Sequence, residues 1–196
     1  MTFTLYIARH GQTEANAALR YPGHRDWALT TLGAKQARDV GTILKRELGS
    51  EPRLAFVSSP LGRAQATMRL VRHEFGLPPD DFAVDARLVD IDHGGWTGFT
   101  DEEVRTRDPD GHRRHCADKW NVPMTGGECY GDVARRAQSF LDGLRGDTVT
   151  VSHGAMTQML RGLSADMDTA LIPALEEPQG VAFRVRDRVI ARLDPV

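Results

Sequence analysis

Short apolar runs alternate along the chain with longer amphipathic stretches. The apolar runs that have the length of buried strands lie at residues 2–8, 53–59 and 147–154. The stretches in which apolar residues recur at helical spacing are 30–49, 60–75, 128–144 and about 156–163. Because strands alternate with helices, the pattern predicts an α/β fold, a three-layer α/β/α sandwich with a mainly parallel central sheet.

Capping and turn residues set the expected ends of several elements. The Ser-Pro pair at 59–60 joins a capping hydroxyl to a proline suited to a first helical turn, so a helix is expected to begin there. Residues 82–92 are predicted to be extended. Apolar and polar residues alternate on both sides of 187–188, which predicts a β-hairpin over 181–194.

The segment 93–127 interrupts this regular pattern because it is rich in Gly, Asp, Arg and His. We expect it to be largely irregular, with one helix near 101–107. We also expect residues 1–196 to form one domain, in which a loop or cap insertion of about 93–127 covers the substrate.

Composition narrows the range of functions. The 196 residues are 40% hydrophobic and 27% charged, with a net charge of -2 and a pI near 6.4. This balance gives no sign of a general nucleic-acid or membrane surface. Cys116 and Cys129 are too few for a disulfide framework, and the first apolar run is too short to span a bilayer. A cytoplasmic location is therefore expected.

Candidate chemistry appears where the apolar runs end. The first run stops at Arg9-His10, the last stops at His153, and Arg63 follows the middle run within one helical turn. In an open α/β sheet, ligands bind outside the carboxyl ends of the strands. Two imidazoles and two guanidiniums are therefore expected to converge on one crevice.

This combination favours phosphate chemistry. Guanidinium groups bind phosphoryl oxygens in a bidentate manner, and a neutral imidazole is a competent covalent nucleophile. The sequence contains no GxxxxGK[ST] loop. A phosphate group would therefore be held by side chains and not by a glycine-rich backbone cradle.

The motifs resemble those of a known family. RHGQTEAN at residues 9–16 resembles the RHG signature of the histidine phosphatase superfamily, also called phosphoglycerate mutase-like. Further matching stretches follow in family order: GxxDxxLTxxG at 23–33, SSPLGRAQAT at 58–67, LVDIDHGGWTG at 88–98, GGE at 126–128 and VSHG at 151–154.

The resemblance implies a phosphoglycerate mutase-like fold and a specific mechanism without metal or cofactor. His10 would attack the phosphoryl group and form a phosphohistidine, while Arg9, Arg63 and His153 would stabilise charge during transfer. The residues that the resemblance assigns to phosphate binding are Arg9, Thr13, Asn16, Arg63, His153 and Gly154.

The resemblance also requires an acid that protonates the leaving oxygen and then activates water. The family commonly has glutamate at this position, whereas this chain has Asp90. Asp92 is a rival, because alternate residues of an extended segment share a face. Gly23 and His24, in the loop after the RHG motif, are further candidates for the substrate side of the pocket.

Four functions fit these residues. The first is a metal-independent phosphomonoesterase acting on a phosphorylated small molecule, and the second is a cofactor-dependent phosphoglycerate mutase. The third is a phosphate- or phosphoprotein-binding module that has lost catalysis. The fourth, a metallohydrolase with His10, His153 and Asp90 as ligands, is disfavoured because the neighbouring arginines would repel a divalent cation.

Overall fold

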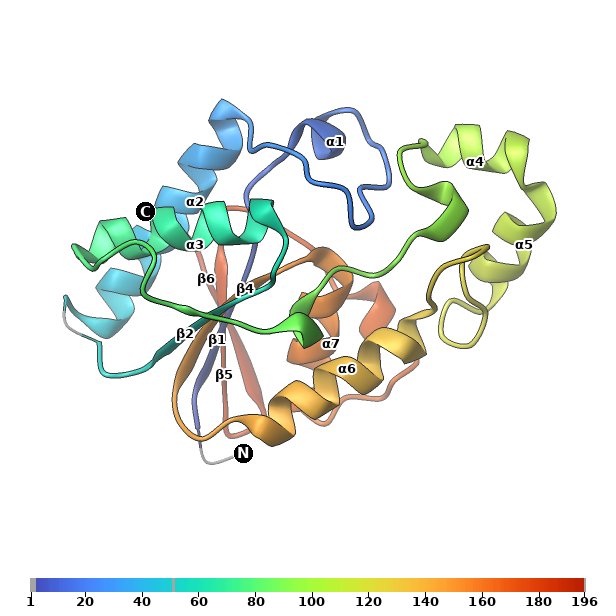
Figure 1. Ribbon diagram of the computed structural model, residues 1–196. Helices are drawn as coiled ribbons and strands as arrows, with labels where there is room; N and C mark the ends of the chain where they lie inside the picture. The colour runs from blue at the N-terminus through green and yellow to red at the C-terminus, as the bar shows by residue number, and fades with distance from the viewer. Residues whose placement is uncertain (1–2, 51, 196) are drawn as a thin grey trace.

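The computed structural model describes residues 3–50 and 52–195. At its centre these residues form a six-stranded sheet in the order β3-β2-β4-β1-β5-β6 (Figure 1). The strands are β1 (Leu5–Arg9), β2 (Ala55–Ser58), β3 (Ala83–Val84), β4 (Thr148–Ser152), β5 (Ala182–Arg186) and β6 (Val189–Leu193). The first four run parallel to one another, and β5 and β6 are antiparallel to their neighbours.

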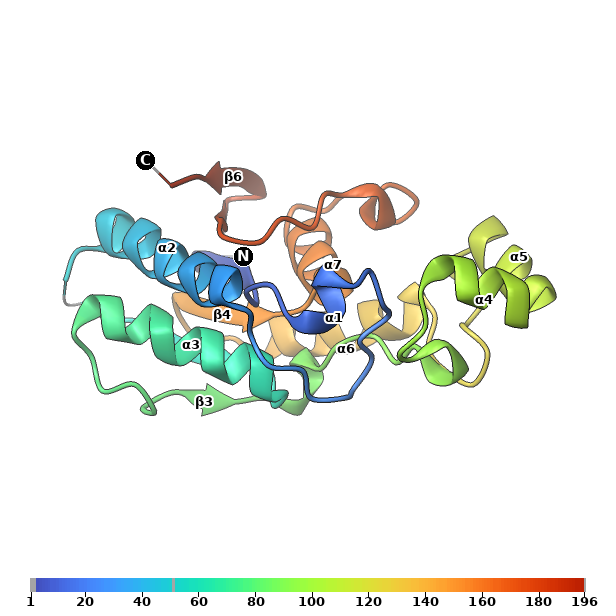
Figure 2. The ribbon, with the colours of Figure 1, turned by 90° about the horizontal axis from the view of Figure 1, so that it is seen from above.

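Helices cover both faces of the sheet. The helices are α1 (Glu14–Ala17), α2 (Thr31–Leu48), α3 (Gly62–Phe75), α4 (Asp101–Arg107), α5 (Pro109–Ala117), α6 (Tyr130–Gly143) and α7 (Gly154–Ser164). Three short 3₁₀ turns are η1 (Ala86–Leu88), η2 (Gly94–Trp96) and η3 (Ile172–Ala174). Figure 2 shows α2 and α3 side by side. Helices α6 and α7 lie apart from this pair and contribute to a different apolar core.

Strand β1 shows why the layers form. Its alternate side chains point to opposite faces of the sheet. Leu5 and Ile7 belong to the apolar core that includes α6 and α7, whereas Tyr6 and Ala8 belong to the core that includes α2 and α3. The predicted three-layer sandwich with a mainly parallel sheet is therefore confirmed.

A close backbone contact fixes α2 against the loop that follows β1. Thr30 caps the helix, because its hydroxyl oxygen accepts a hydrogen bond of 3.0 Å from the Gly33 N–H. Any side chain at Gly33 would collide with the backbone of Gln12. Glycine at this position therefore lets the helix lie directly on the loop that carries His10.

Two predicted boundaries differ from the structure. Helix α3 begins at Gly62 and not at 59–60, because Asp26, from a distant loop, accepts a hydrogen bond of 2.9 Å from the Gly62 N–H. The predicted extended segment 82–92 is a strand only at β3. The Asp85 carboxylate accepts from the Arg87 N–H, and this local bond starts the 3₁₀ turn η1.

The segment 93–127 is more helical than predicted. The helix expected near 101–107 is present as α4, and α5 follows it directly. Trp96 lies at the base of these helices, where its indole N–H donates to Asp108 and its ring packs edge-on against His115, 5.4 Å away. The pair of helices lies to one side of the sheet (Figure 1).

The C-terminal hairpin is formed as predicted by β5 and β6. Asp187 and Arg188 make its turn, with φ of 49° and 65°. These left-handed values suit the type I′ turn that two-residue hairpins prefer. Across the described ranges, none of the helices has the length and apolar character needed to cross a bilayer.

Candidate active site

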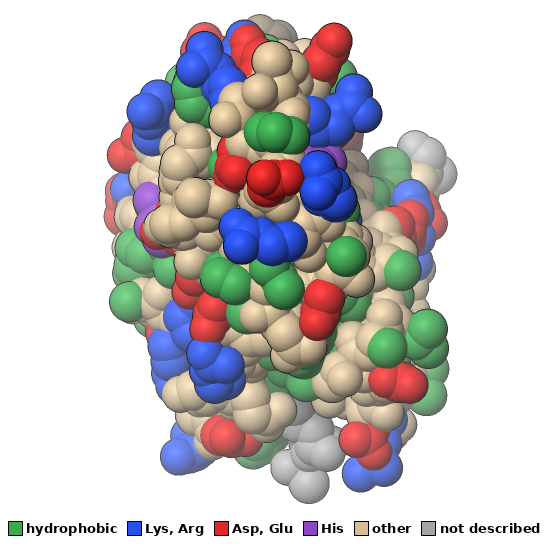
Figure 3. Space-filling view, turned by 90° about the vertical axis from the view of Figure 1, so that its right-hand side faces the viewer, with side chains coloured by type: hydrophobic (Ala, Val, Ile, Leu, Met, Phe, Trp, Pro, Cys, Tyr) green, Lys and Arg blue, Asp and Glu red, His purple; other side chains and the backbone are tan. Residues whose placement is uncertain are grey.

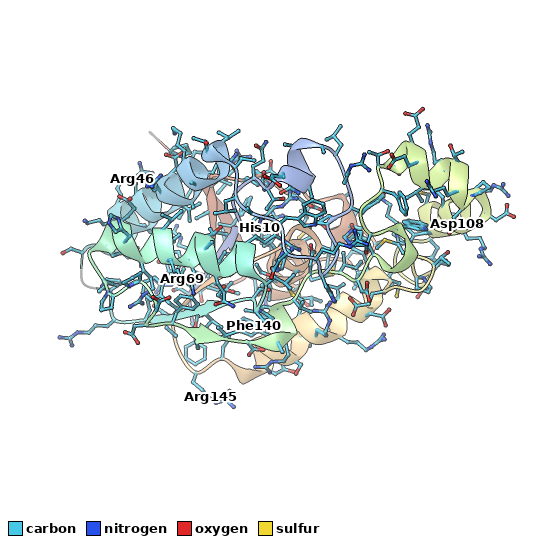
Figure 4. All side chains as sticks on the ribbon, turned by 45° about the horizontal axis from the view of Figure 1, so that its top comes forward. His10, Arg46, Arg69, Asp108, Phe140 and Arg145 are labelled. Carbon is cyan, nitrogen blue, oxygen red and sulfur yellow. The ribbon has the colours of Figure 1, made fainter. Side chains whose placement is uncertain are left out.

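The two predicted histidines meet at the carboxyl ends of β1 and β4. The backbone N–H of His10 donates to the Ser152 carbonyl at 2.9 Å, and the centroids of the His10 and His153 rings are 5.1 Å apart. Only 1% of His10 and 0% of His153 is exposed. Figure 4 shows His10 toward the middle of the molecule, between α1 and α3. The parallel pairing of the two strands brings these side chains together.

The hydrogen bonds of His10 define its tautomer. Nδ1 lies 2.8 Å from the Gly11 carbonyl oxygen, which can only accept, so Nδ1 carries the proton. Nε2 accepts from Arg63 Nε at 3.2 Å. Burial, followed by the charges of Arg9 and Arg63, holds the pKa of His10 well below its usual value. His10 is therefore a neutral imidazole with a lone pair on Nε2.

Arg63, at the start of α3, organises the centre of the site. Its Nη2 donates to Asp90 Oδ2 at 2.9 Å and to the Gly23 carbonyl at 2.8 Å. Its Nη1 donates to the Arg25 carbonyl at 2.8 Å. The guanidinium is buried, with its charge balanced by the equally buried Asp90. One fork thus orients both the nucleophile and the predicted acid.

His153 has one engaged and one unpaired ring nitrogen. Nε2 is 2.7 Å from the Ser59 hydroxyl, whereas Nδ1 is 3.7 Å from Asp90 Oδ2 and makes no hydrogen bond. Burial, then the charges of His10 and Arg63, lowers the pKa of His153. With the Ser59 hydroxyl as donor to Nε2, Nδ1 carries a proton that can be offered to a ligand.

Arg9 supplies a second unpaired donor. Its Nη1 donates to the Glu177 carbonyl at 2.6 Å and lies 3.5 Å from the Glu177 carboxylate, but its buried Nε has no partner among the described residues. Buried polar groups are nearly always hydrogen-bonded. Arg9 and His153 lie at the carboxyl ends of the paired strands β1 and β4. Their unpaired guanidinium N–H and imidazole nitrogen therefore fit an anionic ligand with several acceptor oxygens.

A cavity of about 510 Å³ opens beside these groups. It is lined by Arg9, Gln12, Asn16, Leu19, Arg20, Tyr21, Pro22, Asp90, Ile91, His93, Asp101, Tyr130, Gly154, Ala155, Glu177 and Gln179. A second cavity of about 530 Å³ lies beside Trp120 and Cys129 and contains none of the predicted site residues. Only the first cavity joins the predicted chemistry to a space for substrate.

Asn16, Thr13 and Gly154 take different positions around this cavity. The Asn16 carbonyl oxygen accepts from the Thr13 N–H and from Gln179, both at 3.1 Å, so its NH₂ group is the part left to face the cavity. Thr13 is fully buried and caps α1. Gly154 begins α7 and lines the cavity, and any side chain there would strike the Glu177 carboxylate.

Gly23, His24 and Asp92 do not line the cavity, and neither do the buried residues His10, Thr13, Arg63 and His153. The Gly23 carbonyl accepts from Arg63, and the His24 ring donates to the Asp90 carbonyl at 2.8 Å. Asp92 accepts from the Gly94 N–H at 2.8 Å and caps the turn at η2. The structure therefore brings Asp90, and not Asp92, to the histidines.

Helix α5 carries a basic cluster, His112, Arg113, Arg114 and His115, none of which lines the cavity. His112 contacts Asp101 at 2.8 Å, Arg113 pairs with Asp110 at 3.0 Å, and His115 is buried against the Val122 carbonyl. On the face seen in Figure 3, basic and acidic side chains are interspersed. This arrangement matches a solvated surface more closely than a second anion site.

Sequence reasoning missed Ser59, Glu177, Gln179 and Tyr130. Ser59 lies inside a matching motif, where its hydroxyl is expected only to cap a helix. The other three come from the connection before β5 and from the first residue of α6, where no motif or periodicity singled them out. The contacts of Glu177 and Gln179 with Arg9, His10 and Asn16 depend on tertiary structure, and so does the place of Tyr130 in the cavity lining.

Comparison with known proteins identifies the family. Residues 5–180 match the profile of the histidine phosphatase superfamily (branch 1), and the chain belongs to this family. The predicted class, an enzyme of this superfamily with its fold, is thereby confirmed. Within residues 3–50 and 52–195, no group of three His, Cys, Asp or Glu side chains is arranged to hold a metal ion.

Individual relatives differ in their named activities. The chain is 37% identical over 173 residues to the bifunctional protein Rv2228c of Mycobacterium tuberculosis. The match includes 86% of this chain but only 46% of that relative, so the chain spans about half of the relative's length. It is 33% identical over 189 residues to a 2,3-bisphosphoglycerate-dependent phosphoglycerate mutase of Methylorubrum populi, covering 93% and 88% of the two chains. The structure of mycobacterial glucosyl-3-phosphoglycerate phosphatase Rv2419c superposes with a TM-score of 0.77 at 27% identity, covering 93% and 89%.

Proposed function

We propose that this protein is a phosphomonoesterase that hydrolyses a phosphorylated small molecule through a phosphohistidine on His10. The observation that carries the proposal is the neutral His10, whose Nε2 lone pair faces a cluster of donors from Arg63, Arg9 and His153. Phosphoryl transfer depends mainly on positioning and charge stabilisation, which this cluster supplies without a metal.

The reaction follows from the positions of these groups. Asp90 enters the first step as the carboxylic acid, after it takes a proton from the phosphate monoanion of the substrate. Arg63 Nε moves its hydrogen bond from His10 Nε2 to a phosphoryl oxygen, which frees the lone pair. His10 Nε2 then attacks phosphorus, and the bond to the leaving oxygen breaks as Asp90 transfers its proton to that oxygen. Arg63, Arg9 Nε and His153 Nδ1 donate to the phosphoryl oxygens during transfer. Asp90 then removes a proton from water, whose oxygen attacks the phosphohistidine and releases phosphate and free His10.

Asp90 is the acid in this scheme because it lines the cavity and lies between Arg63 and His153. Replacing Asp90 by asparagine should slow hydrolysis of alkyl phosphates much more than hydrolysis of p-nitrophenyl phosphate, whose leaving group needs little protonation. Steady-state kinetics on both esters measures the difference. Asp92→Asn is the matched control, and a selective loss in that variant would assign the acid to Asp92 instead.

The alternative is a phosphoglycerate mutase, the activity named for the Methylorubrum relative. Such an enzyme would return the phosphoryl group to substrate and not to water. Incubation with 3-phosphoglycerate and a bisphosphorylated primer separates the two activities. Release of inorganic phosphate is expected, and rapid formation of 2-phosphoglycerate with little free phosphate would overturn hydrolysis.

Assays of phosphate release also test the two remaining alternatives, a metallohydrolase and a binding module without catalysis. Phosphate release that survives exhaustive EDTA treatment is expected, whereas loss of activity restored by a divalent cation would indicate a metallohydrolase. No release from a broad panel of phosphomonoesters would indicate a binding module. We also propose that the chain forms a single domain in which residues 93–127 cover the substrate. Its partner is a phosphorylated small molecule and not nucleic acid or a membrane, and its setting is the cytoplasm.

A further inference from the structure

Glu177 places a carboxylate in the wall of the substrate cavity. It comes from the connection between η3 and β5 and is partly buried against Gly154, where a side chain would strike it. Its carboxylate is 3.5 Å from Arg9 Nη1, and its own backbone carbonyl accepts from the same nitrogen. These contacts hold Glu177 at the edge of the proposed phosphate clamp.

The other carboxylates that line the cavity are already paired. Asp90 contacts Arg63, and Asp101 accepts from the Tyr21 hydroxyl at 2.9 Å and contacts His112. The cavity cation Arg20 is engaged by Glu103 at 2.7 Å, outside the cavity. Glu177 has one ion-pair partner among the described residues, Arg9, a member of the proposed clamp. Asp90 also pairs with a clamp residue, Arg63, but it is assigned to proton transfer, whereas Glu177 has no part in the proposed reaction.

Arg9 can contact Glu177 and a bound phosphoryl group at the same time. Its Nη1 faces Glu177, whereas its unpaired Nε is free to donate to a phosphoryl oxygen. A bound phosphoryl group then shares the single charge of Arg9 with Glu177. The Glu177 carboxylate consequently enters the complex with its charge incompletely balanced, next to the space that receives the leaving group.

We propose that Glu177 selects phosphomonoesters whose leaving group carries a positively charged nitrogen and disfavours those that carry a second anion. An ammonium group beside the Glu177 carboxylate would neutralise the negative charge that Arg9 no longer balances fully once a phosphoryl group is bound. A carboxylate on the substrate would be repelled. Tyr21 and Tyr130 line the same cavity, and tyrosine rings attract cations. The inference rests on the proposed hydrolysis and adds the class of substrate.

Three two-carbon esters provide a matched test: 2-aminoethyl phosphate, 2-hydroxyethyl phosphate and phosphoglycolate. They differ mainly in a distal ammonium, hydroxyl or carboxylate group. Leaving-group reactivity also differs between them, so the quantity to compare is the ratio of kcat/KM for the ammonium and carboxylate esters in different variants. Intrinsic reactivity cancels when this ratio is compared between wild type and Glu177→Gln.

The ratio is expected to fall by about tenfold or more in Glu177→Gln, the loss that follows from removing one charge-assisted contact. Glu176→Gln is the control, because Glu176 is exposed and pairs with Arg192 at 2.7 Å, outside the cavity. Its ratio should match wild type. An unchanged ratio in Glu177→Gln, or an equal fall in Glu176→Gln, would overturn the inference.

Hydrolysis of p-nitrophenyl phosphate by wild type distinguishes a failure of this inference from a failure of the proposed function. If this ester is hydrolysed but the ratio does not respond to Glu177, the inference fails and the proposed function stands. If wild type hydrolyses none of the esters, both fail. Where the two-carbon esters bind without turnover, their inhibition constants against p-nitrophenyl phosphate replace kcat/KM in the same comparison.

Discussion

Replacing His10 by alanine is expected to abolish phosphatase turnover while the protein remains folded. The loss should be at least about a thousandfold, because removing a covalent nucleophile leaves only the binding and electrostatic contributions of the site. The buried His10 side chain makes two hydrogen bonds, one to the Gly11 carbonyl and one with Arg63. Its removal should cost only about 1 to 2 kcal/mol of folding free energy.

Turnover of p-nitrophenyl phosphate and thermal unfolding measure these two effects separately. His73→Ala is the matched control, because His73 lies on the exposed surface of α3 and should retain full activity. Retention of more than a few per cent of wild-type activity in His10→Ala would contradict covalent catalysis by this residue. A variant that fails to unfold cooperatively would instead show that His10 is needed for structure.

Replacing Arg63 by lysine is expected to lower kcat/KM by about a hundredfold to a thousandfold, the usual effect of removing one donor to transition-state charge. Lysine keeps the positive charge but cannot hold His10, Asp90 and the Gly23 carbonyl with one planar fork. Rate and affinity should both suffer, since Arg63 orients the nucleophile as well as the phosphoryl group.

Arg63→Met should in addition destabilise the fold by about 3 kcal/mol or more, because the buried Asp90 carboxylate loses its partner. The double variant Arg63→Met with Asp90→Asn removes the unpaired charge, so it should recover much of that stability without recovering activity. Arg69→Ala is the control from the same helix, where Arg69 is exposed and away from His10 (Figure 4). Activity of Arg63→Lys near the wild-type level would contradict the assigned role.

The convergence of Arg9, His10 and His153 is predictable from the sequence. It depends only on the apolar runs that these residues follow and on the shared direction of parallel strands. Each residue follows an apolar run, and parallel neighbours bring their carboxyl ends to the same edge of a sheet. Arg63 could be added because it follows a third run of the same kind. The pairing of β1 with β4 and of β4 with β2 then places all three strand ends together.

Other parts of the site depend on contacts that no local pattern encodes. Ser59 reaches His153 across 94 residues, and Glu177 reaches Arg9 across 168. Helix α5 escaped prediction because its buried positions include Gly111 and His115, which produce no apolar stripe. Its start was nevertheless encoded locally, since Asp108 caps a helix whose first residue is proline.

The most direct test of the central claim is to trap the phosphorylated enzyme. Wild-type protein mixed rapidly with p-nitrophenyl phosphate and denatured within the first turnover should carry a phosphoryl group on His10, stable to base and labile to acid. Peptide mass spectrometry locates the group, and His10→Ala should carry none. An enzyme that turns over substrate without any protein-bound phosphoryl group, or that carries an acid-stable ester at a hydroxyl such as Ser59, would contradict the account.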